Sequence, residues 1–393
     1  MLDITKRNFL KFVSLLSTQL VLPNKVFSAT EGDLDSVTSA QLFPSNIAGK
    51  MTSLHDYMSP EELEDANSDN PHRDHSAALK KALQNTSFLY LPAVKGAYRF
   101  KDVELPDGVW LIGNSKLPYM GSQSSKLIGC GSSIIMAEGG TCIFKYNNNV
   151  TLFGLALYGN EKLDSDGVTF ANTEVGKLSN LRFLYCGFYG FRIAIGNKNK
   201  YIKVDVNNCV ISANKVGVYN IVDSKVFGGS INGNMADGIL LNKGANDNTF
   251  LNVKVEWNDG SNFKFINSVN NIISSCISDR AGQYGIYLNS SQVVIDSSVF
   301  RRNSAKISND EKSGHVLLTG ERTSALIRSI KTVIGRDDDK SGKVSPKYGI
   351  VCQGESSAMK LIVSDSDLTG VTGSSFNFSV KPDIFKNTNN ITK

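Results

Sequence analysis

Two short motifs, Glu256-Trp257 and Asp279-Arg280, each join a carboxylate to a bulky or cationic neighbour. They stand at similar points of two consecutive sequence repeats, and our alignment sets the two carboxylates one position out of register. Carboxylates about 5 Å apart on neighbouring strands could serve glycoside hydrolysis as acid and base, or as acid and nucleophile. A β-elimination would instead need a base and a cation that neutralises a uronate carboxylate.

Residues around the two motifs extend this candidate site. Asp237 lies one repeat earlier and Asp259 follows Trp257 closely, so the candidate catalytic residues are Glu256, Asp279, Arg280, Asp259 and Asp237. An indole could stack on a sugar ring, and basic residues would suit a uronic-acid polymer. The candidate substrate-binding residues are therefore Trp257, Lys254, Lys264, Arg301 and Arg302. The alternative interpretation is that all of these are ordinary solvated turn residues.

The element that must position these residues is a repeat that runs from about 178 to 304. Each unit holds an apolar-rich strand, a bend rich in Asn, Gly and Ser, and a further strand. Equivalent positions fall 21 to 24 residues apart, at Val210, Ile231, Val255, Ile277 and Val299. Strands with this period and no helical pattern between them are typical of a β-solenoid. Because the grid of a leucine-rich repeat is absent, we predict an all-β fold, a right-handed parallel β-helix with three short strands per coil.

Asparagines recur at one bend of the repeat. Asn214, Asn234 and Asn303 occupy the same place, and Asn258 lies near it. Asn and Gly tolerate left-handed backbone better than other residues. We therefore predict that these asparagines form a structural ladder at a turn rather than a ligand site.

Composition narrows the classes of function. The 393 residues carry a formal net charge of only +5, without the clustered basic excess of a nucleic-acid-binding protein. Six scattered cysteines lack metal-ligand spacing, so we expect core thiols, at most one disulfide, and no metal site or cofactor. Two acidic loops could bind Ca²⁺ but fit hydrated loops better; they are Asp164-Ser165-Asp166 and Asp337-Asp338-Asp339.

Residues 1–29 have the pattern of an export signal. Lys6, Arg7 and Lys11 precede an apolar run over 12–22, and small residues follow at 28–29. The run is too short for a comfortable membrane span. Residues 5–11 also resemble the twin-arginine export motif, with Lys6 in place of its first arginine. We expect a periplasmic or secreted protein; the alternative is an uncleaved N-terminal helix.

The rest of the chain divides by its patterns. We predict a linker and short helix over 30–70, with the helix following Ser59-Pro60. An N-terminal cap with a short helix follows over 71–113, then the β-helix over 114–375 and a C-terminal tail over 376–393. Polar segments at 304–314 and 336–347 are predicted to be loops between coils, because strand patterns resume after each.

The cap region resembles that of the pectate-lyase-like β-helix superfamily, which includes phage tailspikes and capsule depolymerases. The matching residues are Asp74, Ser76–Leu79, Ala82-Leu83, Leu91–Ala93, Gly96–Tyr98 and Leu105–Gly113. The superfamily's more familiar Gly-rich start is absent, and Leu54–Met58 and an acidic helix stand there instead. The resemblance covers roughly residues 50–375 and implies the fold more than the activity.

These patterns favour an exported bacterial protein that cleaves an acidic surface polysaccharide or exopolysaccharide by hydrolysis or β-elimination. A non-catalytic polysaccharide-binding or assembly protein is the first alternative. A phage tailspike is the second, and the export-like segment argues against it. The expected partner is an anionic polysaccharide rather than nucleic acid. We expect no transmembrane segment in the mature chain, and a monomer or homotrimer.

Overall fold

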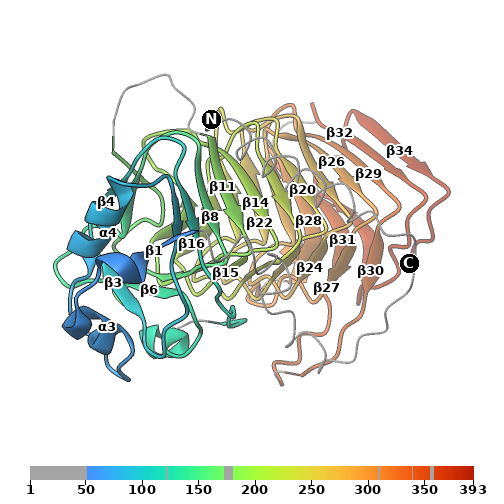
Figure 1. The fold of residues 1–393 in the computed structure, drawn as a ribbon. Helices are drawn as coiled ribbons and strands as arrows, with labels where there is room; N and C mark the ends of the chain where they lie inside the picture. The colour runs from blue at the N-terminus through green and yellow to red at the C-terminus, as the bar shows by residue number, and fades with distance from the viewer. Residues whose placement is uncertain (1–50, 121–122, 172–179, 309, 339, 355–357) are drawn as a thin grey trace, which may run out of the picture. The chain divides into compact units, whose positions relative to one another are not determined.

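The computed structural model describes residues 51–393 except 121–122, 172–179, 309, 339 and 355–357. The expected export signal at 1–29 lies outside the described residues. The described chain winds into a right-handed parallel β-helix, as predicted, with strands of successive coils stacked side by side (Figure 1). Each regular coil contributes one strand to each of three long sheets, called sheets I, II and III here.

Sheet I and sheet II are hydrogen-bonded stacks of parallel strands. Sheet I consists of β1 (Thr52–Ser53), β2 (Phe88–Tyr90), β5 (Trp110–Ile112), β8 (Val150–Phe153), β11 (Asn180–Leu184), β14 (Lys203–Asn207), β17 (Lys225–Phe227), β20 (Thr249–Leu251), β23 (Asn271–Ser274), β26 (Gln292–Asp296), β29 (Ser324–Arg328), β32 (Lys360–Ser364) and β34 (Ile384–Thr388). Sheet II consists of β3 (Tyr98–Phe100), β6 (Ser133–Met136), β9 (Ala156–Tyr158), β12 (Gly187–Tyr189), β15 (Val210–Ser212), β18 (Ser230–Asn232), β21 (Lys254–Glu256), β24 (Ile277–Asp279), β27 (Val299–Arg301) and β30 (Lys331–Val333).

Sheet III begins later, and a small sheet IV stands nearer the N-terminus. Sheet III consists of β13 (Ile193–Gly196), β16 (Val216–Tyr219), β19 (Ile239–Leu241), β22 (Phe263–Ile266), β25 (Ile286–Asn289), β28 (Gly314–Thr319), β31 (Tyr348–Cys352) and β33 (Ser374–Phe378). Sheet IV consists of β4 (Val103–Leu105), β7 (Phe144–Tyr146) and β10 (Thr169–Phe170). The described helical turns are η3 (Leu54–Tyr57), α3 (Pro60–Ala66), α4 (Ser76–Leu83), η4 (Ser124–Leu127) and η5 (Asp310–Lys312).

The core fills the inside of the coils. Strand side chains alternate between inside and outside, and the inward positions of sheet II include Ile211, Ile231, Val255 and Phe300, all 0–1% exposed. Helix α4 buries Leu79 and Ala82 against the first coils. The helix therefore covers apolar surface that the end of a solenoid would otherwise expose.

The bend after sheet II is held by the predicted asparagine ladder. Asn214 Oδ1 accepts from the Phe191 N–H at 3.0 Å, and Asn234 Oδ1 accepts from the Asn214 N–H at 3.0 Å. Asn258 Oδ1 accepts from the Asn234 N–H at 3.1 Å, so Asn258 belongs to the ladder itself. These side chains are buried and satisfy buried backbone donors from coil to coil.

The structure differs from the expected boundaries at both ends. Strands β2, β3 and β5 lie within the predicted cap but already stack into sheets I and II, so the coils begin before residue 114. Residues 376–393, predicted to be a tail, include the end of β33 and all of β34, which pair with β31 and β32. These strands form in spite of their polar composition, because the backbone of each one is hydrogen-bonded to the coil before it.

Candidate functional site

The two candidate carboxylates lie side by side on sheet II. Glu256 ends β21 and pairs in register with Asp279, which ends β24. The expected offset of one position is therefore wrong. Our alignment matched Val255 with Ile277, but Val255 pairs with Ser278. Ser278 occupies an inward position, where its hydroxyl lies 3.0 Å from the Asn262 amide nitrogen, and a polar residue at a core position concealed the register.

Glu256 and Asp279 point away from the solenoid core. They alternate along their strands with inward-facing Val255 and Ser278. Even so, Glu256 is only 2% exposed and Asp279 is 0% exposed, because side chains and loops cover them from outside. Buried charged groups outside an apolar core need partners, since an isolated buried charge is costly. The interpretation as solvated turn residues is wrong for this pair.

Asp279 is held by two arginines. Arg302 donates from Nε to Asp279 Oδ1 at 2.9 Å and from Nη2 to Oδ2 at 2.6 Å, which is a bidentate pair. Arg301 follows Asp279 in register on β27, and its Nε lies 2.8 Å from Oδ2. The hydrogen bond to Asp279 raises the pKa of Arg302. An aspartate engaged on both oxygens is better suited to fixing the arginines than to attacking a substrate.

Glu256 is the poised titratable group of the site. Burial, and then the charge of Asp279, raise the pKa of Glu256 to about 7, while Arg301 and Arg302 oppose the shift. Lys254 Nζ lies 2.8 Å from Glu256 Oε1 without the alignment of a hydrogen bond. A carboxyl group that titrates near neutral pH can both accept and return a proton, which is the requirement for general acid–base catalysis.

Trp257 and Arg280 occupy equivalent turn positions after Glu256 and Asp279. Both have left-handed backbone, with φ of 55° and 53°. The Arg280 guanidinium lies 5.1 Å from the Trp257 ring centroid, and that of Arg302 lies 5.8 Å from it. Trp257 remains 37% exposed beside the two arginines. An exposed indole next to buried cations can stack on a sugar ring while the cations meet an anionic group.

Two loops flank this stretch of sheet II. On the C-terminal side, the 334–347 loop contributes Asp338, which accepts from Arg302 Nη1 at 2.6 Å, and Ser341, which accepts from Arg280 Nη2 at 2.7 Å. On the N-terminal side, the 113–132 loop places the Tyr119 ring 5.6 Å from Lys254 Nζ. The loops bound the part of the outer face where Glu256 lies.

The remaining predicted residues lie outside this cluster. Asp237 pairs with Lys264 at 3.4 Å and accepts from the Ser261 N–H at 2.8 Å. Asp259 forms an ion pair with Lys306 at 2.7 Å, and both side chains are more than half exposed. For Asp259, the interpretation as a solvated turn residue therefore fits. The structure brings together Glu256, Asp279, Arg280, Lys254, Trp257, Arg301 and Arg302.

Sequence reasoning missed two polar residues on the same outward row. Ser212 and Asn232 precede Glu256 in register on β15 and β18. Correct alignment of the repeats would have placed them there. Sequence reasoning also treated Asp338 only as a loop carboxylate, whereas it binds Arg302.

The two acidic loops bind cationic side chains. Asp166 forms a bidentate pair with Arg192 at 2.9 and 2.7 Å. Within the described ranges, no group of three or more His, Cys, Asp or Glu side chains is placed to hold a metal ion. All six cysteines lie in the described part of the chain and all are free. Among the helices described, none has the length and apolar character needed to cross a membrane.

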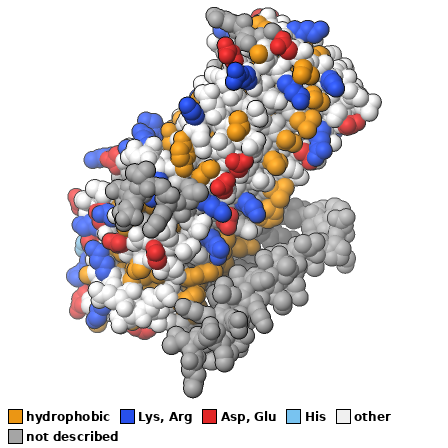
Figure 2. All heavy atoms as spheres, turned by 90° about the horizontal axis from the view of Figure 1, so that it is seen from above, with side chains coloured by type: hydrophobic (Ala, Val, Ile, Leu, Met, Phe, Trp, Pro, Cys, Tyr) orange, Lys and Arg blue, Asp and Glu red, His pale blue; other side chains and the backbone are white. Residues whose placement is uncertain are grey.

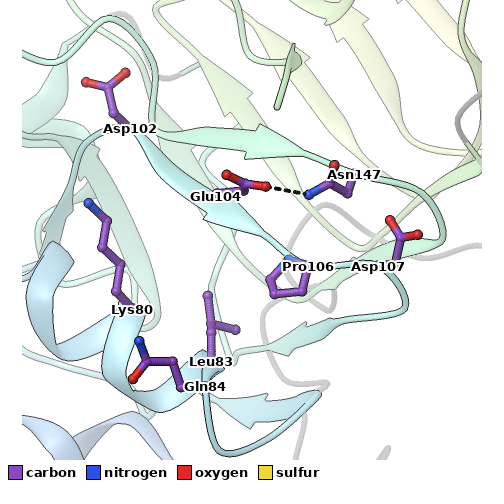
Figure 3. Close-up of a pocket in the computed structure, with 8 residues that line it drawn as sticks. All are labelled: Lys80, Leu83, Gln84, Asp102, Glu104, Pro106, Asp107 and Asn147. Carbon is purple, nitrogen blue, oxygen red and sulfur yellow. Dashed lines mark hydrogen bonds between the residues drawn. The ribbon is translucent and has the colours of Figure 1, made fainter. Parts of the chain in front are cut away.

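A separate hollow of about 760 Å³ lies between α4 and β4, near the N-terminal end (Figure 3). Its polar lining includes Asp102, which accepts from the Thr141 N–H at 3.3 Å, and Glu104, which accepts from the Asn147 side chain at 3.0 Å. Asp102 is partly exposed and Glu104 is exposed. The hollow thus lacks the burial that makes Glu256 distinctive.

No family model matches the chain. Solved structures with the same fold include the A-module of mannuronan C-5 epimerase AlgE4 from Azotobacter vinelandii, with a TM-score of 0.55 and 14% identity over 85% of this chain and 98% of that one. Tailspike protein 2 from an Escherichia coli O157:H7 bacteriophage has a TM-score of 0.53 and 13% identity over 75% of this chain. A GH87 α-1,3-glucanase catalytic domain has a TM-score of 0.52 and 15% identity over 74% of this chain.

These similarities establish the parallel β-helix fold. The chain spans only 40% of the tailspike and 56% of the glucanase domain, but nearly all of the epimerase module. The neighbours are described as a tailspike, an epimerase of mannuronan and a glucanase, so this fold serves polysaccharide-active proteins. Identities of 13–15% carry no residue roles to this chain.

Proposed function

We propose that this protein binds an acidic polysaccharide along the outer face of sheet II and cleaves it by β-elimination at Glu256. The observation that carries the proposal is the combination of a buried carboxyl group whose pKa lies at about 7 with the guanidinium groups of Arg301 and Arg302 beside it. The fold shared with other polysaccharide-active proteins supports the choice of polymer.

The step uses the groups present at the site. The ionised Glu256 carboxylate takes the proton from C5 of a uronate unit, whose carboxylate is neutralised by arginine. The C4–O bond breaks as the C4=C5 double bond forms, and the departing oxygen takes up a proton returned by Glu256 or given by the Lys254 ammonium group. Lys254 Nζ lies 2.8 Å from Glu256 Oε1, so either donor is within reach of the same sugar unit.

Hydrolysis is the less favoured reaction at this site. A retaining hydrolase would need Asp279 as the nucleophile. Both oxygens of Asp279 are engaged by Arg302, which lowers the availability of its lone pairs. An inverting hydrolase would need a second carboxylate free to activate water.

Product analysis tests the proposal. The purified protein is incubated with alginate, polygalacturonate and hyaluronan, and the ultraviolet absorbance of unsaturated uronates is followed together with the release of reducing ends. We expect both signals to rise together on at least one polymer. Reducing ends without absorbance would indicate hydrolysis. Binding without either signal would support a polysaccharide-binding or assembly protein instead.

We also propose that the protein acts in the periplasm or outside the cell. The charge and apolar pattern of residues 1–29 supports this proposal. Fractionation of cells that express the full chain tests it, because a cytoplasmic product that retains residues 1–29 would contradict export. Light scattering of the purified protein distinguishes a monomer from a homotrimer, the two states that we expect.

A further inference from the structure

One outward row of sheet II carries polar side chains on consecutive strands. In register from β15 to β27, the row is Ser212, Asn232, Glu256, Asp279 and Arg301. Neighbouring strands of a sheet lie about 4.8 Å apart, so four steps extend over roughly 19 Å. This length exceeds what a single sugar unit needs and suits a stretch of polymer that lies along the solenoid axis.

The first two members of the row are buried, and each has a side-chain oxygen without a hydrogen-bond partner among the described residues. Ser212 is 0% exposed and Asn232 is 1% exposed. Within the described residues, Ser212 Oγ and Asn232 Oδ1 have no hydrogen-bond partner. The Asn232 amide nitrogen donates to Ser230 Oγ at 3.3 Å, which fixes the side chain. Because an unpaired buried polar atom costs free energy, such atoms in a native fold indicate a ligand or water.

The side chains at the turn positions next to the row change from small to bulky between Asn232 and Glu256. After each strand of the row comes one residue with left-handed backbone, and these residues are Ala213, Gly233, Trp257, Arg280 and Arg302. Small residues therefore stand beside Ser212 and Asn232, whereas bulky ones stand beside the carboxylates. The result is a ledge that ends at the indole of Trp257.

The side chain that lies against the ledge can move. A Cβ built on Gly233 would lie 2.8 Å from the terminal methyl of Met120, so Met120 covers the ledge. Met120 is 49% exposed, and methionine is unbranched and flexible. It can therefore turn aside without disturbing sheet II.

We propose that Ser212 and Asn232 form a second saccharide-binding subsite, which takes an uncharged, hydroxyl-rich sugar unit next to the unit at Glu256. The two residues offer oxygen acceptors to sugar hydroxyls, the ledge admits the ring, and Trp257 closes the end. The row has no cationic side chain at the end formed by Ser212 and Asn232. Its opposite end is Arg301, with Arg302 in the adjoining turn. The subsite rests on the proposed function and specifies it: the preferred polymer contains neutral units beside its uronates.

The test is the affinity of the full chain for defined oligosaccharides. The double variant S212A/N232A is compared with the wild type by calorimetry, using hyaluronan disaccharide and hexasaccharide as mixed probes and a hexamer of galacturonate as the uniformly acidic probe. The control is the double variant N207A/S274A, which removes outward-facing polar groups of the same kinds from sheet I.

We expect the double variant to bind the hyaluronan hexasaccharide about tenfold more weakly, from the loss of two hydrogen bonds, with the disaccharide affinity and the Tm unchanged. The control should match the wild type. A loss equal for both lengths, or a fall in Tm without a change in affinity, would overturn the subsite. Tighter wild-type binding to galacturonate would overturn it while sparing the proposed function. If the wild type binds no probe, the subsite proposal fails, and the product analysis with alginate, polygalacturonate and hyaluronan decides the proposed function separately.

Discussion

The outer faces of sheet I and sheet II are built from the same coils, yet the ion pairs that they carry differ in exposure to solvent. On sheet I, Asp296 accepts from Arg328 at 2.9 Å, and the arginine side chain is 55% exposed. On sheet II, Asp279 is 0% exposed, and its bidentate partner Arg302, in the turn after β27, is 7% exposed. An exposed ion pair contributes little to stability, whereas removing one partner of a buried ion pair is strongly destabilising. Burial, rather than charge, thus distinguishes the candidate site.

The outer face of sheet I also exposes large apolar side chains. Phe227, Leu251 and Ile272 on the outer face of sheet I are 41%, 37% and 41% exposed. On the face of the molecule shown in Figure 2, hydrophobic side chains run in a line with Lys, Arg, Asp and Glu among them. Apolar atoms make up much of the exposed surface of folded proteins, so exposed apolar residues here need no function. Sheet I therefore serves as an internal control for sheet II.

The largest difference should appear in stability. Arg302→Met leaves Asp279 buried without its bidentate partner, and we expect the free energy of unfolding to fall by about 3–5 kcal/mol. The control Arg328→Met removes an exposed partner of Asp296 and should cost about 1 kcal/mol or less. Urea unfolding measures both. Equal losses would show that burial at sheet II makes no energetic difference.

The next effect is a pH dependence that only sheet II should produce. The raised pKa of Glu256 means that the folded state binds a proton more tightly than the unfolded state, so stability is greatest below about pH 4.5 and falls as the pH rises to about 7. Other groups titrate as well, so the comparison is with Glu256→Gln, which should remove this part of the fall in Tm. Identical Tm profiles for the two proteins would contradict the assignment.

The smallest effect concerns ring stacking. Trp257→Ala should weaken binding of an acidic oligosaccharide by roughly threefold to tenfold, the contribution expected of one aromatic contact. Phe227→Ala removes an aromatic side chain of similar exposure from sheet I and should leave the affinity unchanged. Fluorescence or calorimetric titration with the same oligosaccharide checks both. If the two variants bind equally well, sugar stacking on Trp257 is excluded.

The sequence alone could predict the fold because its periodicity reflects the coils directly. Inward apolar residues such as Ile231 and Val255 recur with each coil, and Asn214 and Asn234 recur at the bend where buried backbone needs a partner. The register of the candidate site was not predictable in the same way. Ser278 stands where an apolar residue is expected, so the pattern moved by one position at the strand that carries Asp279.

The covering of the site depends on contacts between distant parts of the chain. Nothing in the local sequence indicates that Asp338 reaches Arg302 across 36 positions, because the path of a long loop is set by the groups that it meets. For the same reason the sequence did not show that Glu256 is buried. Its neighbours Lys254 and Trp257 are polar or exposed, and the cover comes from other coils and loops.

The central claim is that Glu256 is the proton carrier of a polysaccharide-cleaving site on sheet II. The most direct measurement is the initial rate of formation of unsaturated uronate by the wild type and by Glu256→Gln, on a polymer that the wild type cleaves. We expect the variant to retain its fold and its affinity for the polymer while the rate falls by roughly 10²–10⁴-fold. A variant that cleaves at the wild-type rate would contradict the claim.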